Sequence, residues 1–305
     1  MILRQKLTLA LTLALATASA NAIPLVYVLT DAAQFGKVDL ATGGFTPIGP
    51  GLTEGSGGLV SGPGGSLYTL AFSGNLNAIN PSTGISTLVG ATGLGDCSQP
   101  TSACGSNSAN VLGKLGATLY ATDFKNNLYT VNPATGLATL IGPTGIPAIP
   151  YTPHTPILGD PDGSFTVFDE SLFEHGGKLY ANFAAGIFDP VTFTPTPTID
   201  PHLYQIDPIT GLATVIAPTS FGLSTILDVD GNVYAFDFAL GQIVGLDLPT
   251  GNISYVSDLS YDVGLIGGAT SAEPSPVPEP GSLALVGTGL VAVATKIREW
   301  RRSRS

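Results

Sequence analysis

The sequence predicts an all-β chain folded as a β-propeller of five blades, with room for a sixth. Three features lead to this prediction: a short repeated pattern, a tyrosine before each copy, and a late segment that can close the ring. A pattern of the type Ile-Asn-Pro-x-Thr-Gly occurs five times, at 38–43, 79–84, 131–136, 206–211 and 246–251. A tyrosine-marked stretch precedes each copy, and a Gly-rich apolar segment near the first copies recurs only after the last. Self-similarity with a period of about 40 residues is typical of four-stranded propeller blades.

Each copy of the pattern is predicted to be the turn of a β-hairpin. In the second copy, Thr83-Gly84 is followed by the β-prone stretch Ile85-Ser86-Thr87-Leu88-Val89. Gly84 can adopt positive φ at the turn, and the β-branched residues suit a pleated surface. The Thr-Gly spacings of 41, 52, 75 and 40 residues place insertions in the two longer gaps. The last insertion holds Pro-rich runs at 146–161 and 189–201, which are expected to be loops on one rim of the ring.

The strand before each hairpin carries a tyrosine, and the chain also contains a candidate for closing the ring. The marking residues are Tyr27, Tyr68, Tyr120, Tyr180 and Tyr234. The segment 57–62 precedes Tyr68, a similar segment lies at 263–268, and nothing equivalent fits between Ile23 and Tyr27. Because an open array of blades would leave sheet edges unpaired, the late segment is expected to supply the strand that the first blade lacks.

The two ends of the sequence are predicted to be targeting segments. Residues 1–22 have basic Arg4 and Lys6, an apolar run at 7–16 and the small residues Ala20 and Ala22, which fit a signal peptide cleaved to release Ile23. The propeller is assigned to 23–270 and a Pro-rich linker to 271–280. A transmembrane helix is assigned to 281–297, with a charge-free stretch at 281–295, and a basic cytoplasmic tail to 298–305.

The region from Val277 onward has three features in a fixed order. Val277-Pro278-Glu279-Pro280 comes first, the apolar span second, and a basic end third, with Arg298, Arg301, Arg302 and Arg304. This arrangement resembles the PEP-CTERM sorting signal of bacterial surface and exopolysaccharide-associated proteins, a motif also called an ice-binding protein C-terminal domain, although the label says nothing about ice binding here. The resemblance implies recognition and cleavage by an exosortase, whereas a plain C-terminal anchor would give the same topology without cleavage.

That topology implies a location. The domain is expected to be exported and held at the inner membrane, and then to reach the cell surface or extracellular matrix of a Gram-negative-type bacterium. The repeats themselves resemble those of uncharacterised extracellular bacterial propellers, related in style to quinoprotein-like repeats. The tryptophan pattern of quinone-binding blades is missing, since the only tryptophan is Trp300. A quinone cofactor is therefore not expected.

Composition excludes one class of partner. Between residues 23 and 280 there are four lysines and no arginine against 21 acidic residues, a formal charge of −17. Nucleic acid is not an expected partner, because phosphate binding depends on clustered Lys and Arg. Cys97 and Cys104 lie in a Gly- and Ser-rich stretch and are predicted to form a disulfide in an oxidising exterior, in preference to a metal or redox site.

Carboxylates near the marking tyrosines are candidates for catalysis. Some five-bladed propellers are glycosidases that use acidic residues at the central channel. Asp31, Asp123 and Asp237 follow a marking tyrosine by four, three and three residues, and Glu170 is a fourth candidate. An Asp that recurs after each strand is equally explained as a structural feature of the blade. No nucleophile elbow or phosphate-binding loop is present.

Metal sites are weaker hypotheses. Asp228 and Asp230, and likewise Asp160 and Asp162, precede a glycine as in the start of a calcium loop, but neither segment continues to the glutamate that completes an EF-hand. Hairpin turns are the favoured interpretation. No cofactor is expected, with Ca²⁺ as the ion that would suit so acidic a domain. The histidines His154, His175 and His202 are expected to be solvated loop residues rather than metal ligands.

The sequence therefore favours an exported, membrane-tethered or exosortase-processed propeller that acts as a binding or structural module without catalysis. Its expected partners are an exosortase-type enzyme, the inner membrane, and an extracellular polysaccharide or envelope protein. The alternative is a carbohydrate-active propeller enzyme of the glycoside hydrolase or lyase type.

Overall fold

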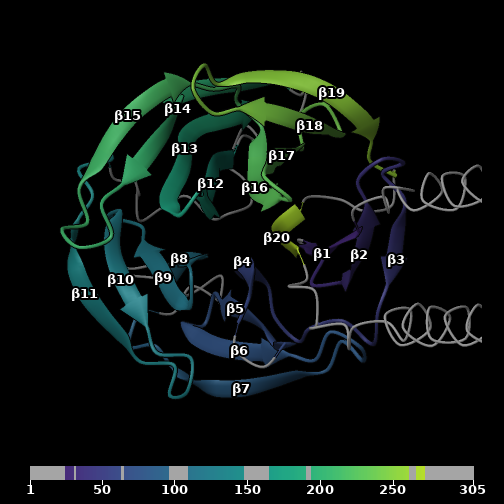
Figure 1. The fold of residues 1–305 in the computed structure, drawn as a ribbon, viewed down its shortest axis with the longest axis vertical. Coiled ribbons are helices and arrows are strands. Elements are labelled where there is room, and N and C mark those ends of the chain that lie inside the picture. Colours follow the sequence, from purple (N-terminus) through teal and green to yellow (C-terminus); the bar gives the residue numbers. More distant parts are fainter. Residues whose placement is uncertain are drawn as a thin grey trace, which may run out of the picture. The chain divides into compact units, whose positions relative to one another are not determined.

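The structure is a computed structural model that describes residues 25–30, 32–62, 65–95, 109–147, 165–189, 194–260 and 266–271. These ranges contain 20 strands. The strands form five four-stranded sheets. In Figure 1 the sheets are arranged as blades around a ring. The all-β, five-bladed prediction is confirmed, and the described ranges hold no sixth blade. The predicted signal and transmembrane helices lie outside these ranges.

Each blade has its own set of four strands. Blade 1 comprises β20 (Ile266–Ser271), β1 (Leu25–Thr30), β2 (Phe35–Asp39) and β3 (Phe45–Pro47). Blade 2 comprises β4 (Ser56–Ser61), β5 (Leu67–Ala71), β6 (Asn75–Ile79) and β7 (Ser86–Ala91). Blade 3 comprises β8 (Ala109–Leu115), β9 (Thr118–Asp123), β10 (Asn127–Val131) and β11 (Ala138–Pro143). Blade 4 comprises β12 (Phe165–His175), β13 (Lys178–Asp189), β14 (Thr194–Ile206) and β15 (Ala213–Pro218). Blade 5 comprises β16 (Leu223–Val229), β17 (Asn232–Asp237), β18 (Gln242–Asp247) and β19 (Asn252–Asp258).

The ring is closed by a sheet that joins distant parts of the chain. β20 pairs antiparallel with β1, with Val26 opposite Ser271 and Val28 opposite Ala269. The first blade therefore takes its innermost strand from residues 266–271, as the glycine-rich segment predicted. All described strands and sheets lie within Leu25–Ser271, and this part of the chain belongs to one compact unit that ends at Ser271.

The hydrophobic core consists of five clusters, each of which lies between two neighbouring blades. Val60 and Leu70 of blade 2 pack with Leu112 and Leu119 of blade 3, for example. The other four clusters join blades 3 and 4, 4 and 5, 5 and 1, and 1 and 2 in the same way. Since both faces of each blade contribute to such clusters, burial of apolar side chains holds adjacent blades together.

The repeated Thr-Gly turns join the third and fourth strands of each blade, and they also contact the preceding blade. Gly251 has φ of 71°, which favours glycine, and a Cβ added to it would lie 1.8 Å from the carbonyl oxygen of Pro218 in the preceding blade. At Gly43 the added Cβ would lie 1.7 Å from the carbonyl oxygen of Asp258. The repeated glycine is therefore needed both for the turn and for close packing of one blade on the next.

One predicted loop is a strand. The Pro-rich run 189–201 was expected to form a rim loop, but β14 covers Thr194–Ile206, 13 residues, and pairs with β13, which has 12. β15 pairs with β14 only from His202 onward, so residues 194–201 form an edge of the sheet. Pro195 and Pro197 lie two residues apart, which places their nitrogens on the same side of the strand. Prolines are tolerated in an edge strand, because only one side of its backbone takes part in a ladder.

Candidate functional site

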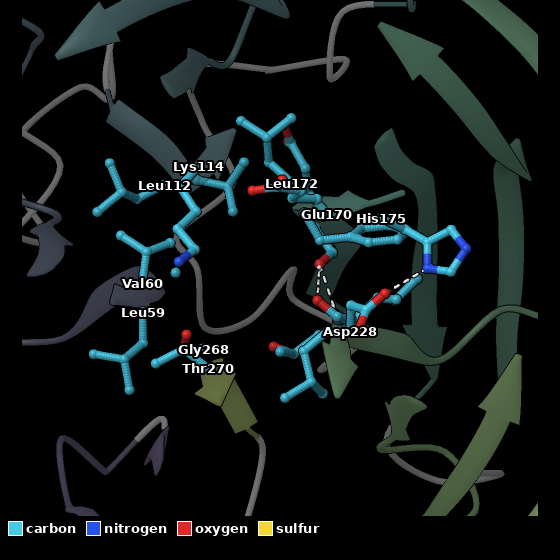
Figure 2. Close-up of a pocket in the computed structure, with 18 of the residues that line it drawn as sticks. Leu59, Val60, Leu112, Lys114, Glu170, Leu172, His175, Asp228, Gly268 and Thr270 are labelled. Atoms are coloured by element: carbon cyan, nitrogen blue, oxygen red, sulfur yellow. Dashed lines mark hydrogen bonds and ion pairs between the residues drawn. The ribbon is translucent and has the colours of Figure 1, made fainter. Parts of the chain in front are cut away.

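The five innermost strands surround a cavity of about 300 Å³. Strands β4, β8, β12, β16 and β20 all contribute to its wall, and in Figure 1 they are the strands closest to the centre of the ring. Each is the first strand of its sheet, so one backbone edge of each has no strand partner within the described sheets. Figure 2 shows the side chains that line this central cavity.

The inner strands run in the same direction, and this brings their ends to one mouth of the cavity. Later residues of one inner strand contact later residues of the next, which is the sign of a parallel arrangement. Gly113 of β8 approaches Leu172 of β12, and the backbone N–H of Gly116, just after β8, donates to Glu174, two residues further along β12. The same order holds between β12 and β16, where Ser171 contacts Ile226 and His175 contacts Asp228. Parallel inner strands therefore place charged residues from blades 3, 4 and 5 near a common opening.

Three charged side chains of the cavity are fixed by hydrogen bonds to a neighbouring blade. The ammonium group of Lys114 donates to Ser61 Oγ at 2.6 Å. Glu174 Oε2 accepts the backbone N–H of Gly116 at 2.8 Å. Glu170 Oε1 accepts from the hydroxyl of Thr122 at 2.6 Å. Such charge-assisted contacts are stronger than neutral ones, so the positions of these groups are set before any ligand arrives.

His175 and Asp228 form a short polar contact in the wall of the cavity. Nδ1 of His175 lies 2.5 Å from Oδ2 of Asp228, and the other oxygen of Asp228 accepts the backbone N–H of Gly231 at 2.9 Å. The ring of Tyr180 packs edge-on against the imidazole. A carboxylate that holds one imidazole nitrogen fixes the orientation of the ring, and such a pair can serve in binding or in proton transfer. The expectation that His175 lies in a loop is wrong, because it ends strand β12 and lines this cavity, where its side chain is 31% exposed.

Among the predicted catalytic residues, Asp123 holds a turn together. It ends β9, is fully buried, and Oδ1 accepts the backbone N–H groups of Lys125 and Asn127, both at 2.9 Å. Oδ2 accepts from the side-chain amide of Asn127 and the hydroxyl of Tyr129, both also at 2.9 Å. Burial of Tyr129, together with its hydrogen bond to the Asp123 carboxylate and the charge of that group, raises the pKa of the tyrosine to about 12.

Asp237 occupies the equivalent place at the end of β17. It is 1% exposed, and its Oδ1 accepts the backbone N–H of Leu240 at 3.0 Å. Burial raises the pKa of this carboxyl group, against the opposing effect of the N–H groups of Leu240 and Ala239. Neither Asp123 nor Asp237 lines the central cavity, whereas Glu170 does.

In blade 1 the corresponding strand ends at Thr30, and its hydroxyl accepts the backbone N–H of Gln34 at 3.1 Å. The fourth catalytic candidate, Asp31, lies outside the described residues. Thr30, Asp123 and Asp237 therefore hold equivalent positions at the end of the second strand of their blades. In each case a side-chain oxygen accepts a backbone N–H of the turn that follows.

The structure describes half of the predicted metal ligands. Asp228 contacts His175 and Gly231, and Asp230 has φ of 54° in the turn that follows β16. No group of three or more His, Cys, Asp or Glu side chains in the described ranges is placed to hold one metal ion. The remaining predicted site residues lie outside those ranges: Asp160, Asp162, His154, Cys97, Cys104, Ala20, Ala22 and the sorting-signal residues Val277, Pro278, Glu279, Pro280, Arg298, Arg301, Arg302 and Arg304.

Sequence reasoning missed Lys114, Glu174 and the contact between His175 and Asp228. A signal for them exists in the repeat. Lys114, Glu174 and Asp228 each lie six residues before the marking tyrosine of their own blade, at Tyr120, Tyr180 and Tyr234. A charged residue at the same offset in three consecutive blades indicates that charged side chains gather at one end of these three inner strands.

Comparison with protein families identifies a sorting motif in this chain. Residues 276–302 match the PEP-CTERM protein-sorting motif. No curated protein sequence matches the chain. Within the described ranges no helix is long and apolar enough to cross a membrane, and the predicted span 281–297 is outside them.

Solved structures with a similar fold include a nidogen/laminin complex, at 12% identity over 82% of this chain and 98% of that one, with a TM-score of 0.47. Another is a protein of unknown function from Bacteroides thetaiotaomicron, at 16% identity over 78% and 56% of the two chains, with a TM-score of 0.44. A third is a virginiamycin B lyase from Staphylococcus aureus, at 13% identity over 80% and 72%, with a TM-score of 0.36. At these levels of similarity none of them bears on the ligand of the cavity.

The fold and the motif together define a class of protein: an exported, membrane-anchored β-propeller that is sorted by an exosortase. More particularly, this chain is a five-bladed propeller with a PEP-CTERM motif at 276–302.

Proposed function

We propose that this protein is a surface-displayed binding module that takes a small polar ligand into its central cavity. The observation that carries the proposal is the convergence of Lys114, Glu170, Glu174, His175 and Asp228, from three blades, on one cavity of about 300 Å³. That volume is at the lower end of the range for small-molecule sites. Fixed polar groups in a concave, partly apolar wall are the usual features of such a site.

The location is part of the same proposal. The motif at 276–302 supports tethering at the inner membrane through 281–297, followed by exosortase processing and release to the cell surface or extracellular matrix. At that location the protein would meet extracellular polysaccharide and envelope components, which are therefore the candidate sources of its ligand. The formal charge of −17 between residues 23 and 280 keeps the exported domain soluble and disfavours anionic polymers.

The second candidate is a carbohydrate-active enzyme, and one observation favours it. Glu170 and the pair formed by His175 and Asp228 line the same cavity, so an acid and a base could act on one bound substrate. Asp123 and Asp237 already accept backbone N–H groups at their turns, which accounts for their recurrence without catalysis. Among the four carboxylates predicted from the sequence as catalytic, Glu170 is therefore the best candidate.

The test uses the exported chain from Ile23 onward and a panel of mono- and oligosaccharides, with thermal shift to detect binding and mass spectrometry to detect products. We expect a saturable shift that Glu170→Gln and His175→Gln weaken and that Glu54→Gln, outside the cavity, leaves unchanged. Binding that none of the cavity variants alters would place the ligand elsewhere. Product formation abolished by Glu170→Gln would favour the enzyme.

A further inference from the structure

Among the described residues that line the central cavity, negative formal charges outnumber positive ones. The residues that line it include three carboxylates, Glu170, Glu174 and Asp228, and one ammonium group, Lys114. These four groups sum to a formal charge of −2, with the imidazole of His175 left out of the count. A small site with walls of low dielectric concentrates this field, so a positively charged ligand is favoured over a neutral or anionic one of the same size.

The carboxylates are held so that they can still accept hydrogen bonds. Each ionised carboxylate offers about four lone-pair positions. Glu174 uses Oε2 for the backbone N–H of Gly116, and among the described residues its Oε1 has no hydrogen-bond partner. Asp228 is oriented by His175 and Gly231, one contact on each oxygen. Acceptors fixed in this way come from two inner strands, β12 and β16, and both residues line the cavity, so an ammonium group bound there meets charged acceptors from two blades.

The rest of the wall indicates what accompanies that ammonium group. Lys114 already donates to Ser61 and Thr270 already accepts the backbone N–H of Ser61, but an ammonium group has three donors and a hydroxyl group has one donor and two acceptor positions. Together with the hydroxyl of Thr225, which also lines the cavity, these groups suit the hydroxyl oxygens of a sugar. Leu59, Leu112 and Leu172 give the wall apolar patches between the polar groups. A ligand that fits this pattern combines one positive charge with several hydroxyl groups on a compact carbon frame.

We infer that the ligand of the central cavity is a hydroxylated primary amine of monosaccharide size, the chemistry of an amino sugar with a free ammonium group. This inference rests on the proposed function, since it names the ligand class of the same cavity. It further predicts opposite effects of two charge changes. Removing a negative group weakens binding of the cation, whereas removing Lys114 relieves repulsion and strengthens it.

The test is isothermal titration of the exported chain with glucosamine, N-acetylglucosamine, glucose and glucuronate. We expect glucosamine to bind about tenfold or more tightly than N-acetylglucosamine, because acetylation removes the charge and its charge-assisted hydrogen bonds. Glu174→Gln should weaken glucosamine binding by about tenfold, and Lys114→Met should strengthen it. Glu54→Gln removes a carboxylate outside the cavity and should leave the affinity unchanged.

The outcomes separate the two proposals. If the neutral sugars or glucuronate bind as tightly as glucosamine and Lys114→Met weakens all of them, the ligand class is wrong while the cavity remains the binding site. If none of the four probes binds, the amino-sugar inference is overturned. If ligands found in the wider panel also bind independently of every cavity variant, the proposed function fails as well.

Discussion

Nδ1 of His175 lies 2.5 Å from Oδ2 of Asp228, and this contact joins the inner strands of blades 4 and 5 at the edge of the central cavity. The two side chains are 31% and 24% exposed, so water reaches the pair and screens it only in part. The contact is therefore both a link between blades and a fixed feature of the candidate site.

The energetic value of that link can be measured with a double-mutant cycle. His175→Gln and Asp228→Asn should each lower the free energy of unfolding by about 1 kcal/mol, with a coupling energy of about 0.5 kcal/mol or more between them. Urea unfolding of the wild type, the two single variants and the double variant provides the four values. Strictly additive effects would show that the contact contributes nothing to stability.

The Thr-Gly turns should be more sensitive to substitution than other glycine turns. Gly251→Ala places a methyl group 1.8 Å from the carbonyl oxygen of Pro218, in addition to the cost of positive φ, and should lower the free energy of unfolding by about 3 kcal/mol. Gly231 is the matched control, because its φ is 81° and an added Cβ meets nothing within 4 Å. Gly231→Ala should cost about 1 kcal/mol. Equal losses in chemical denaturation would argue against blade docking as the reason for the repeated glycine.

Two aspartates should respond to pH in opposite directions. Burial raises the pKa of Asp237 above the ordinary 3.8, so its contribution to stability is present at low pH and is lost as pH rises through the folded-state pKa. Backbone N–H groups of Ile209 and Thr210 and the hydroxyl of Thr210 lower the pKa of Asp207, so its contribution is lost as pH falls.

Denaturation between about pH 3 and 7 tests this difference. As pH rises, Asp237→Asn should become more stable relative to the wild type, and Asp207→Asn less stable. The same slope for both variants would contradict the assignment.

Tyr129 should be one of the last tyrosines to ionise. Its pKa of about 12, raised by burial and by Asp123, means that its contribution to stability is present at neutral pH and is lost as pH rises from the ordinary 10.0 towards 12. A spectrophotometric titration should show a late phenolate component that Tyr129→Phe removes. A titration curve unaffected by Tyr129→Phe would show that this hydroxyl ionises with the others.

The sorting motif makes a prediction outside the propeller. Replacing Pro278, Glu279 and Pro280 by alanine in the full-length chain should block removal of the tail in a host that contains an exosortase, because these residues form the motif within the matched range 276–302. Mass spectrometry of the surface fraction would detect the mature C-terminus. The matched control replaces residues 273–275, a Glu-Pro-Ser run just before the matched range, by alanine and should be processed normally. Processing of the variant that lacks Pro-Glu-Pro would reduce the segment to a plain anchor.

Much of the fold could be predicted from periodic sequence features. The Thr-Gly copies and the five tyrosines correspond to the third-to-fourth-strand turns and second strands of five blades, and the segment around 263–268 anticipated β20. The run 189–201 was mistaken for a loop, because prolines normally interrupt a strand, and only the structure shows that residues 194–201 belong to an edge strand paired on one side alone. Asp123 and Asp237 were grouped by their spacing from a tyrosine, which identifies equivalent positions but does not show which way a side chain points.

The sequence alone determined the repeated blade, the closing strand and the sorting motif, because each is a local pattern that repeats or stands in a fixed order. It allowed either five or six blades, and the described sheets number five. Only the folded ring decided that Lys114, Glu174 and Asp228 belong to one site. These residues are separated by more than fifty positions in the sequence, and they meet because five inner strands run in the same direction around a common axis.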